Sequence, residues 1–355
     1  MAVLGQALVA ILAVVLVAVT LLPLSRSHAW WVRVWDFPRV QIAIGLAAVL
    51  ALSLLLPGWV GWSVAVAAAG CLGWQVWRIL PFTPLVHREM QFAAGSAPAD
   101  VTLVGANVLM ENQQHDQVLA LIRREDPDVL LLMETDATWC EALASALAGY
   151  PTVLRAPRDD HYGMVFATRL EVREAKFVRL TENETPSVFA RIATRDGRPF
   201  HFVGLHPEPP VPGVDTDDRD AQILYAARFA RASGMPLVVM GDFNDAAWSD
   251  TARRFKAYGR YVDPRVGRGI YASFDANRWL IRCAIDQIYV TDDVAVSSFG
   301  LGPHVGSDHF PVIARVRIDA EAAAGLNRPA PPLADDEREG LDARVAAWGR
   351  RIGAE

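Results

Sequence analysis

The sequence has little cysteine, and what it has forms no recognisable framework. Its three cysteines show neither CxxC nor metal-type spacing: Cys71, Cys140 and Cys283. Cysteine patterns that build disulfide scaffolds or zinc sites repeat at short, regular intervals. We therefore expect ordinary packing cysteines, which say little about the redox compartment.

Lysine is also scarce, with only Lys176 and Lys256 among 355 residues. Residues 1–89 carry five arginines against two acidic side chains, a charge of +3, so the overall charge of −6 leaves −9 on the remainder. Proteins that hold nucleic acid through its phosphates present wide basic surfaces. The acidic remainder argues against that mode of binding.

Charge is missing altogether from residues 2–24, which are mostly Ala, Val and Leu. A helix needs roughly 20 apolar residues to cross a bilayer core of about 30 Å. Segments 40–56 and 58–77 are similarly apolar, so we predict three transmembrane helices within an anchor over residues 1–80. A cleaved signal peptide is the alternative for the first, but a basic n-region is missing and two further spans follow.

Tryptophans gather at the predicted span ends, as interfacial aromatics do, although they could instead form the core of a soluble helical domain. They are Trp30, Trp31, Trp35, Trp59, Trp62, Trp74 and Trp77. The arginines near the spans fall on one side of the predicted bilayer: Arg26, Arg33, Arg39, Arg78 and Arg88. The positive-inside rule then predicts a multi-pass protein of the cell (inner) membrane with a cytoplasmic catalytic domain. A periplasmic or extracellular domain is the alternative.

Downstream of a Pro-containing linker at 81–99, strand and helix patterns alternate over 100–318. Strands are expected at 101–108, 128–133, 164–168, 172–179, 188–194, 200–205, 236–241, 284–291 and 310–318, and helices at 113–124, 137–148, 217–232 and 248–258. This alternation is typical of two packed sheets covered by helices. Residues 319–355 read as a Pro-rich segment and a charged helix near 335–351, solvated or partly disordered. We find no internal repeat.

Polar side chains follow several of these strands. They are Asn107, Glu134, His206, Asp242, Asn244, Asp286, Asp308 and His309. Each alone has an ordinary explanation, such as a helix cap for Asp242 and Asn244 or a structural role for a lone histidine. Strand ends meet at one sheet edge, however, so these polar groups are expected to lie close together. Because burying so many polar groups in one place is costly, we expect them to form a functional site.

In order and spacing, these residues resemble the endonuclease/exonuclease/phosphatase superfamily, which includes exonuclease-III-like nucleases, neutral sphingomyelinases, inositol-polyphosphate 5-phosphatases and deoxyribonuclease I. The similarity covers about residues 100–318 and centres on Gly241-Asp242-Phe243-Asn244 and Ser307-Asp308-His309. It implies a four-layer α/β/β/α sandwich, here preceded by three transmembrane helices.

The resemblance also implies a metal site and a catalytic set. Glu134 would be the main ligand of Mg²⁺, or alternatively Mn²⁺, with Asn107 in or next to the coordination sphere and Asp308 beside it. Asp242 would orient or deprotonate the attacking water, aided by Asn244.

Two histidines would meet the phosphate. His309 would do so with an orientation set by Asp286, and His206 would donate to a phosphate oxygen in the transition state. Many relatives carry Arg-Ile-Asp where this chain has Ala284-Ile285-Asp286, so one basic contact is missing.

Substrate-binding candidates lie between the predicted strands at Arg155, Arg158, His161 and Tyr162, although a solvated hairpin tip explains them equally well. The proline-rich turn 206–210 is expected to form a substrate wall.

We predict a membrane-anchored phosphoesterase that hydrolyses a phosphate mono- or diester, with a lipid phosphate favoured as substrate and membrane lipids as partners. No protein partner is predicted. The alternatives are an exonuclease-III-type nuclease and a catalytically inactive binding domain on a membrane anchor.

Overall fold

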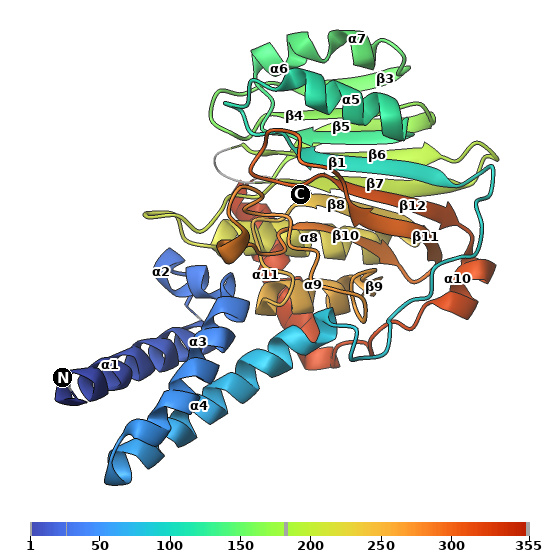
Figure 1. The fold of residues 1–355 in the computed structure, drawn as a ribbon. Coiled ribbons are helices and arrows are strands. Elements are labelled where there is room, and N and C mark those ends of the chain that lie inside the picture. Colours follow the sequence, from blue (N-terminus) through green and yellow to red (C-terminus); the bar gives the residue numbers. More distant parts are fainter. Residues whose placement is uncertain (1, 26, 181–183, 353–355) are drawn as a thin grey trace.

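The protein has two parts, a bundle of N-terminal helices and a larger sandwich of two sheets flanked by helices (Figure 1). The computed structural model describes residues 2–25, 27–180 and 184–352. Because the strands carry almost continuous apolar runs, each sheet can be covered on both faces.

The first sheet has six strands in the order β11-β12-β1-β2-β4-β3. Their bounds are β1 Val101–Asn107, β2 Val129–Met133, β3 Thr152–Ala156, β4 Met164–Thr168, β11 Val294–Leu301 and β12 Val312–Ile318. Strands β1 and β2 run parallel, with Asn107 opposite Met133. The ends of these two strands therefore lie side by side, and so do the residues that follow them.

The second sheet has the order β5-β6-β7-β8-β10-β9. Its strands are β5 Glu171–Arg179, β6 Pro186–Ala193, β7 Pro199–Leu205, β8 Leu237–Asp242, β9 Tyr261–Val262 and β10 Asp286–Thr291. Here β7 and β8 are parallel, and Gly241 lies opposite Leu205. A Cβ at Gly241, whose φ is +146°, would lie 2.0 Å from the Leu205 carbonyl oxygen, so only glycine fits there.

Helices cover the outer face of each sheet and complete the predicted α/β/β/α sandwich. The first sheet is covered by α5 His115–Glu125, α6 Ala137–Ala142 and α7 Ala144–Leu147, and the second by α8 Asp217–Ser233, α9 Asp250–Gly259 and α11 Asp335–Ile352. Between the sheets, side chains such as Leu131, Phe166, Phe202 and Met240 form the central core. The predicted fold class is confirmed.

The N-terminal helices are α1 Ala2–Leu21, α2 Trp30–Arg33, α3 Arg39–Leu52 and α4 Gly58–Ile79, with single 3-10 turns η1 Leu22–Leu24, η2 Val34–Asp36, η3 Ser53–Leu55 and η4 Leu80–Phe82. Two stretches of the described chain, Leu4–Leu24 and Gly58–Phe82, are long and apolar enough to cross a membrane. The predicted span 40–56 differs, because α3 has only 14 residues and is bent by 77° against the preceding helix. It counts as a third candidate only as part of that bent pair.

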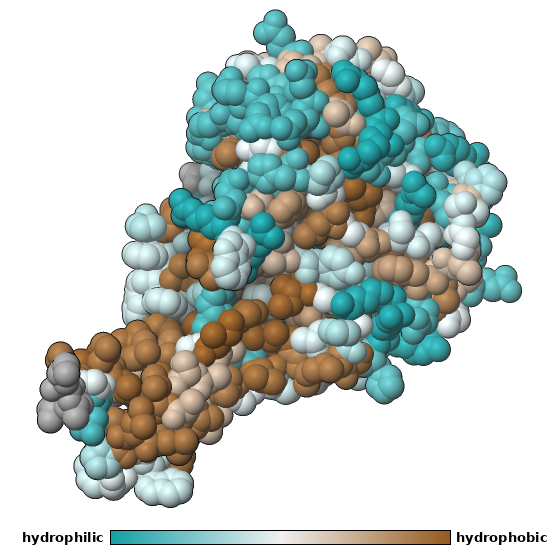
Figure 2. Space-filling view, viewed as in Figure 1, coloured by the Kyte–Doolittle hydropathy of each residue, from teal (hydrophilic) through white to brown (hydrophobic). Residues whose placement is uncertain are grey.

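Large apolar side chains lie exposed on this bundle, among them Leu8, Ile11, Trp59, Trp62 and Val66. Figure 2 shows the resulting hydrophobic surface over the N-terminal helices, in contrast to the largely hydrophilic sandwich. Soluble surfaces seldom carry a contiguous apolar area of this kind. The surface is therefore compatible with membrane association.

Three strands were not predicted: Thr152–Ala156, Tyr261–Val262 and Val294–Leu301. All three lie at sheet edges. The strands Thr152–Ala156 and Val294–Leu301 are partly exposed and lack a clear apolar period, and Tyr261–Val262 is buried but too short to show one. The predicted linker 81–99 is instead packed along the sandwich, and Met90 is fully buried in the central core.

The C-terminal helix α11 buries one face and leaves the other exposed to solvent. It packs on α8 through Leu341, Val345 and Trp348, which are buried in the outer core of the second sheet. Before it lies the short helix α10 Ala320–Leu326.

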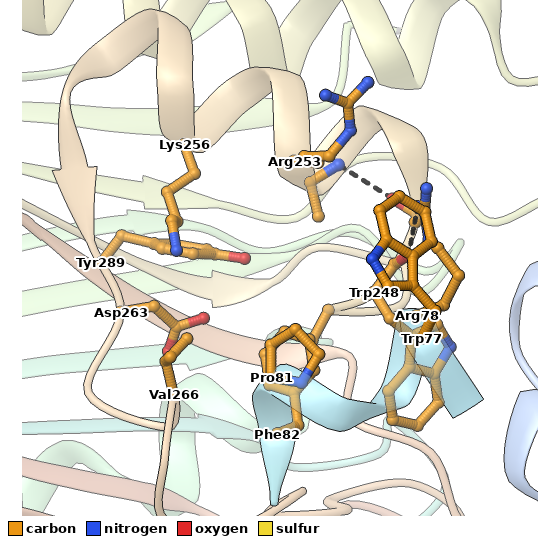
Figure 3. Close-up of a pocket in the computed structure, with 13 residues that line it drawn as sticks. Trp77, Arg78, Pro81, Phe82, Trp248, Arg253, Lys256, Asp263, Val266 and Tyr289 are labelled. Carbon is orange, nitrogen blue, oxygen red and sulfur yellow. Dashed lines mark hydrogen bonds between the residues drawn. The ribbon is translucent and has the colours of Figure 1, made fainter. Parts of the chain in front are cut away.

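Trp248 joins the helical bundle to the sandwich. Its indole Nε1 donates to the Asp36 carbonyl oxygen (2.7 Å), and Arg78 Nε at the end of α4 donates to the carbonyl oxygen of Trp248 (3.1 Å; Figure 3). Phe82 packs edge-on against the same indole ring. These contacts come from three parts of the chain, so they hold the sandwich in a defined position relative to the bundle.

Candidate active site

The predicted polar residues meet at one edge of the two sheets. Asn107 and Glu134 follow the parallel pair β1 and β2, while His206 and Asp242 follow or end the parallel pair β7 and β8. Strands β10 and β12 run antiparallel to their neighbours. Their first residues, or the loop before them, therefore reach the same edge and contribute the remaining side chains, Asp286, Asp308 and His309.

Asn107 links the two sheets at this edge. Its amide Nδ2 donates to Glu134 Oε1 (2.7 Å) and to Asp242 Oδ2 (3.2 Å). The amide oxygen accepts from the backbone N–H of Leu109 (3.1 Å), which fixes the orientation of the group. Asn107 thus presents its amide nitrogen to the two carboxylates and holds them in place.

Glu134 follows β2 with a φ of +60°, in the left-handed region that is rare for a residue with a side chain. This conformation ends the strand and turns the carboxylate into the cleft. Glu134 Oε2 lies 3.2 Å from His161 Nδ1, and the other nitrogen of that imidazole lies 3.3 Å from Glu111.

His309 and Asp286 form a fully buried pair, with His309 Nδ1 2.7 Å from Asp286 Oδ2. The Nε2 atom lies 3.7 Å from Asp242 Oδ2. Burial alone would lower the pKa of His309, but the carboxylates of Asp286 and Asp242 raise it to about 10. The imidazole is therefore a cation at neutral pH, with Nε2–H as a donor on the side of Asp242.

Asp242 and Asn244 form the turn that follows β8. Asp242 Oδ1 accepts the Asn244 backbone N–H (2.9 Å), and Asn244 Nδ2 donates to the Pro207 carbonyl oxygen (2.9 Å). The fully buried Arg219 on α8 donates to the Asn244 carbonyl oxygen (2.9 Å). The amide therefore ties the two parallel strand ends together, and Arg219 holds the loop from behind.

His206 is buried, and its Nε2 lies 3.8 Å from Asp242 Oδ2. Its Nδ1 has no hydrogen-bond partner among the described residues. Tyr162 packs against the imidazole ring, and burial together with nearby carboxylates raises the pKa of its hydroxyl, so Tyr162 stays protonated. Both side chains can donate to a ligand.

These residues surround a cleft of about 570 Å³. Four acidic side chains line it, Glu134, Asp160, Asp242 and Asp308, and no arginine or lysine of the described chain does. Another part of the lining is apolar and includes Val34, Phe37 and Pro38 from the N-terminal part, together with Val211, Phe274 and Ile281.

The predicted substrate-binding residues divide into two groups. His161 and Tyr162 line the cleft. Arg158 instead makes a bidentate pair with Asp160, and Arg155 is exposed on the edge strand β3; neither lines the cleft.

Two groups of acidic side chains could accommodate a divalent cation. Glu134 and Asp308 face the cleft, and burial followed by the negative charge of Glu134 raises the pKa of Asp308, although His309 opposes this. A bound cation would relieve that repulsion. The second group is Asp242, Asp286 and His309, whose ligand atoms lie within 4.8 Å of one another. There the charged imidazole already occupies the position of a cation.

Several contributors were not predicted. Arg219 lies in the first turn of α8, in the sequence Asp-Asp-Arg-Asp. Such a charged sequence is typical of a helix start that is exposed to solvent. Ser273 accepts the Asp286 backbone N–H (3.1 Å), and the Ser307 hydroxyl donates to the Asn107 carbonyl oxygen (2.8 Å). Only Ser307 carried a sequence signal, as part of the Ser-Asp-His motif.

Comparison with known proteins agrees with this geometry. The model of the endonuclease/exonuclease/phosphatase family matches residues 104–309, more than half of the chain. The chain belongs to the endonuclease/exonuclease/phosphatase family. Members of this family are phosphoesterases and nucleases, so the protein is a phosphoric ester hydrolase that acts on phosphate esters, in a family that generally depends on divalent metals. No curated protein sequence matches the chain.

Solved structures share the sandwich at low sequence identity. They include D. rerio TDP2 complexed with single strand DNA product (TM-score 0.53, 14% identity, 62% of this chain and 99% of that chain). Family proteins from Bacteroides thetaiotaomicron (0.52, 19%, 62% and 98%) and Bacteroides vulgatus (0.51, 22%, 62% and 99%) are similar. At these identities the likeness establishes the fold alone.

Proposed function

We propose that the protein is a membrane-anchored, divalent-metal-dependent hydrolase that cleaves a phosphate ester carried by an apolar molecule. One observation carries this proposal. The catalytic cleft joins an acidic floor to an apolar wall, and part of that wall, Val34, Phe37 and Pro38, comes from the N-terminal helical part.

The need for a metal follows from the charge of the cleft. A phosphate ester is anionic, and the four acids of the lining outnumber its one charged histidine, His309, while no arginine or lysine of the described residues lines the cleft, so the cleft alone would repel the ester. Glu134 and Asp308 would hold the cation, Mg²⁺ or alternatively Mn²⁺, with Asn107 orienting Glu134. When bound, the metal supplies Lewis-acid polarisation and neutralises charge on the phosphate.

The remaining side chains would activate water and stabilise charge. Asp242 would accept a proton from the attacking water, and Asn244 would fix its position through the turn contact. His309, kept charged by Asp286, would donate through Nε2 to a phosphate oxygen, and His206 would donate to another as negative charge develops.

An amphipathic substrate accounts for the apolar wall. Beside it, the 3-10 turn Trp279–Ile281 exposes three consecutive apolar side chains, and Gln41 of α3 donates to the Leu280 carbonyl oxygen (2.9 Å). The cleft mouth would therefore lie at the bilayer surface, where a lipid phosphate can enter. The missing basic residues make nucleic acid the less favoured substrate.

The orientation follows from the helix ends. Arg33 and Arg39 pair with Asp36. Asp36 and Arg78 both bond Trp248 of the sandwich, so the three arginines lie at the end of the bundle that contacts the sandwich. By the positive-inside rule, that end and the catalytic domain would face the cytoplasm of a cell-membrane protein. Alkaline phosphatase fused after Ile318 should then be inactive, and periplasmic activity there would reverse the assignment.

The activity is tested on full-length protein in neutral detergent. Phospholipid, polyprenyl pyrophosphate, abasic DNA and a soluble chromogenic phosphodiester are offered with Mg²⁺ or EDTA. We expect Mg²⁺-dependent release of product from a lipid phosphate at higher kcat/KM than from the soluble ester or DNA. Full activity in EDTA would refute the metal requirement, and preference for DNA would establish the nuclease alternative.

A further inference from the structure

A second, separate pocket lies where the helical bundle meets the sandwich. Its volume is about 320 Å³, and it shares no lining residue with the catalytic cleft. Its walls come from η1, α2, η2, the start of α3, and from α4, α8, α9 and α11. We call it the arginine pocket, because five arginines line it: Arg33, Arg39, Arg78, Arg254 and Arg344.

Positive charge in this pocket exceeds negative charge. Three aspartates line it, Asp36, Asp220 and Asp250, against five arginines. The acids are also shared with other cations: Asp220 pairs with Arg219 (2.8 Å) and Asp250 with Arg253 (2.9 Å), and neither of these arginines lines the pocket. Arg344, in turn, pairs with Asp217 (2.9 Å), which does not line the pocket. The other four arginines therefore face three aspartates, and at least one positive charge has no counter-ion of its own.

Buried donors in the pocket also lack acceptors. Arg39 is 2% exposed; its two terminal nitrogens bond Gln75 and Asp36, but its Nε has no hydrogen-bond partner among the described residues. The buried Nε1 of Trp74 has none either. A buried donor without an acceptor is energetically unfavourable. Both residues belong to the lining, so a ligand with acceptor oxygens would offset this cost.

Excess positive charge, unpaired N–H donors and room for a small group together match a phosphate anion. Leu24 and Trp74, near the ends of the two candidate spans, are also part of the lining. If these spans cross a bilayer, as proposed above, the pocket lies at the depth of lipid headgroups.

We propose that the arginine pocket binds the phosphate of an anionic membrane lipid, as a site distinct from the catalytic cleft. This proposal rests on the proposed membrane anchoring but not on catalysis. Free phosphate shares the same chemistry and is the other source to be distinguished.

The matched variants are Arg254→Gln and Arg253→Gln. Both remove one positive charge from α9 and one partner of Asp250. Arg254 lines the arginine pocket, whereas Arg253 lines an apolar cavity of about 190 Å³ that also borders Arg78 (Figure 3). Arg344→Gln, on α11, is a second pocket variant in case Arg254→Gln does not fold.

Lipid retention is measured by native mass spectrometry on full-length protein in neutral detergent, titrated with phosphatidylglycerol or phosphatidylcholine. The wild type should retain one phosphatidylglycerol at a concentration about tenfold lower than phosphatidylcholine. Arg254→Gln should weaken that retention about tenfold, and Arg253→Gln should leave it unchanged. Equal retention of the two lipids, or equal retention by both variants, would overturn the proposal.

Inorganic phosphate is titrated in parallel, with Tm as the readout. A Tm rise with phosphatidylglycerol alone assigns the site to a lipid headgroup, as we expect. A rise with phosphate alone overturns the lipid assignment. Because neither measurement uses turnover, a missing hydrolase activity would leave the result unaffected.

Discussion

The catalytic cleft and the arginine pocket lie on either side of the turn that contains Asp36 and Phe37, yet they are lined by opposite charges. Four acids line the first, with no arginine or lysine among the residues that the structure describes, while five arginines and three aspartates line the second. Both are suited to phosphate, one through a metal and the other directly. The difference shows that a site for turnover and a site for retention solve the same electrostatic problem in different ways.

The largest expected effect comes from Glu134→Gln, which removes a carboxylate from the acidic cleft. Activity should fall by about 10²–10³-fold, because the metal loses its main ligand. The Tm increase that Mg²⁺ gives the wild type should disappear as well. Phosphodiester turnover and thermal melts with and without Mg²⁺ check this. If the variant keeps wild-type activity, the metal does not depend on Glu134.

Asp286→Asn tests the part of the cleft that contains the charged imidazole of His309. The kcat should fall about 10²-fold, since His309 loses the partner that orients and charges it. In the wild type the carboxylates raise the pKa of His309 to about 10, so its charged form persists up to that pH. In the variant this pKa falls, and the alkaline limb of the pH–kcat profile should move to lower pH. An unmoved limb would show that Asp286 does not tune His309.

Phe37→Ala asks whether the apolar wall serves the substrate. The KM for a lipid phosphate should rise about tenfold, because apolar contact is lost. The KM for a soluble phosphodiester should not change. Trp31→Ala is the control, since Trp31 is 52% exposed in the same segment and does not line the cleft. Equal effects of the two variants on the lipid substrate would argue against a specific wall.

The smallest effect concerns Asp245, which competes with Asp220 of the arginine pocket for the same Arg219. Burial raises the pKa of Asp245 to about 7, although Arg219 opposes this. The folded protein thus binds one more proton than the unfolded chain between about pH 4 and pH 7, and stability falls as pH rises through this window. Asp245→Asn should therefore gain about 2–4 °C in Tm over the wild type from pH 5 to pH 8. A constant difference between the two proteins would contradict the assignment.

Much of the fold and the convergence of the site were predictable, because strand periodicity and strand ends are local features. Asn107, Glu134 and Asp242 each follow or end an apolar strand, and parallel pairing alone brings such ends together. The Gly-Asp-Phe-Asn and Ser-Asp-His motifs supplied Asn244, Asp308 and His309, and His206 and Asp286 were predicted from their places at strand ends.

What could not be predicted depends on tertiary contacts. Arg219 reads as a surface residue until α8 packs and buries it behind Asn244. Segment 81–99 reads as a linker, because nothing in its sequence shows that Met90 enters the core. The five arginines of the second pocket come from helices far apart in the chain, so their grouping has no sequence signature.

Trp248 is held from two sides, because its indole bonds Asp36 and Arg78 bonds its backbone carbonyl oxygen. These contacts would limit which substrates can enter the catalytic cleft. An enzyme on a flexible linker can meet substrates at many distances from its point of attachment. In this protein the Trp248 contacts fix the position of the sandwich relative to the bundle. With the bundle in a bilayer, as proposed, these contacts would set the distance from the bilayer to the catalytic cleft. Selection among headgroups would then follow from their size, with short ones failing to reach the cleft floor and bulky ones stopping above it.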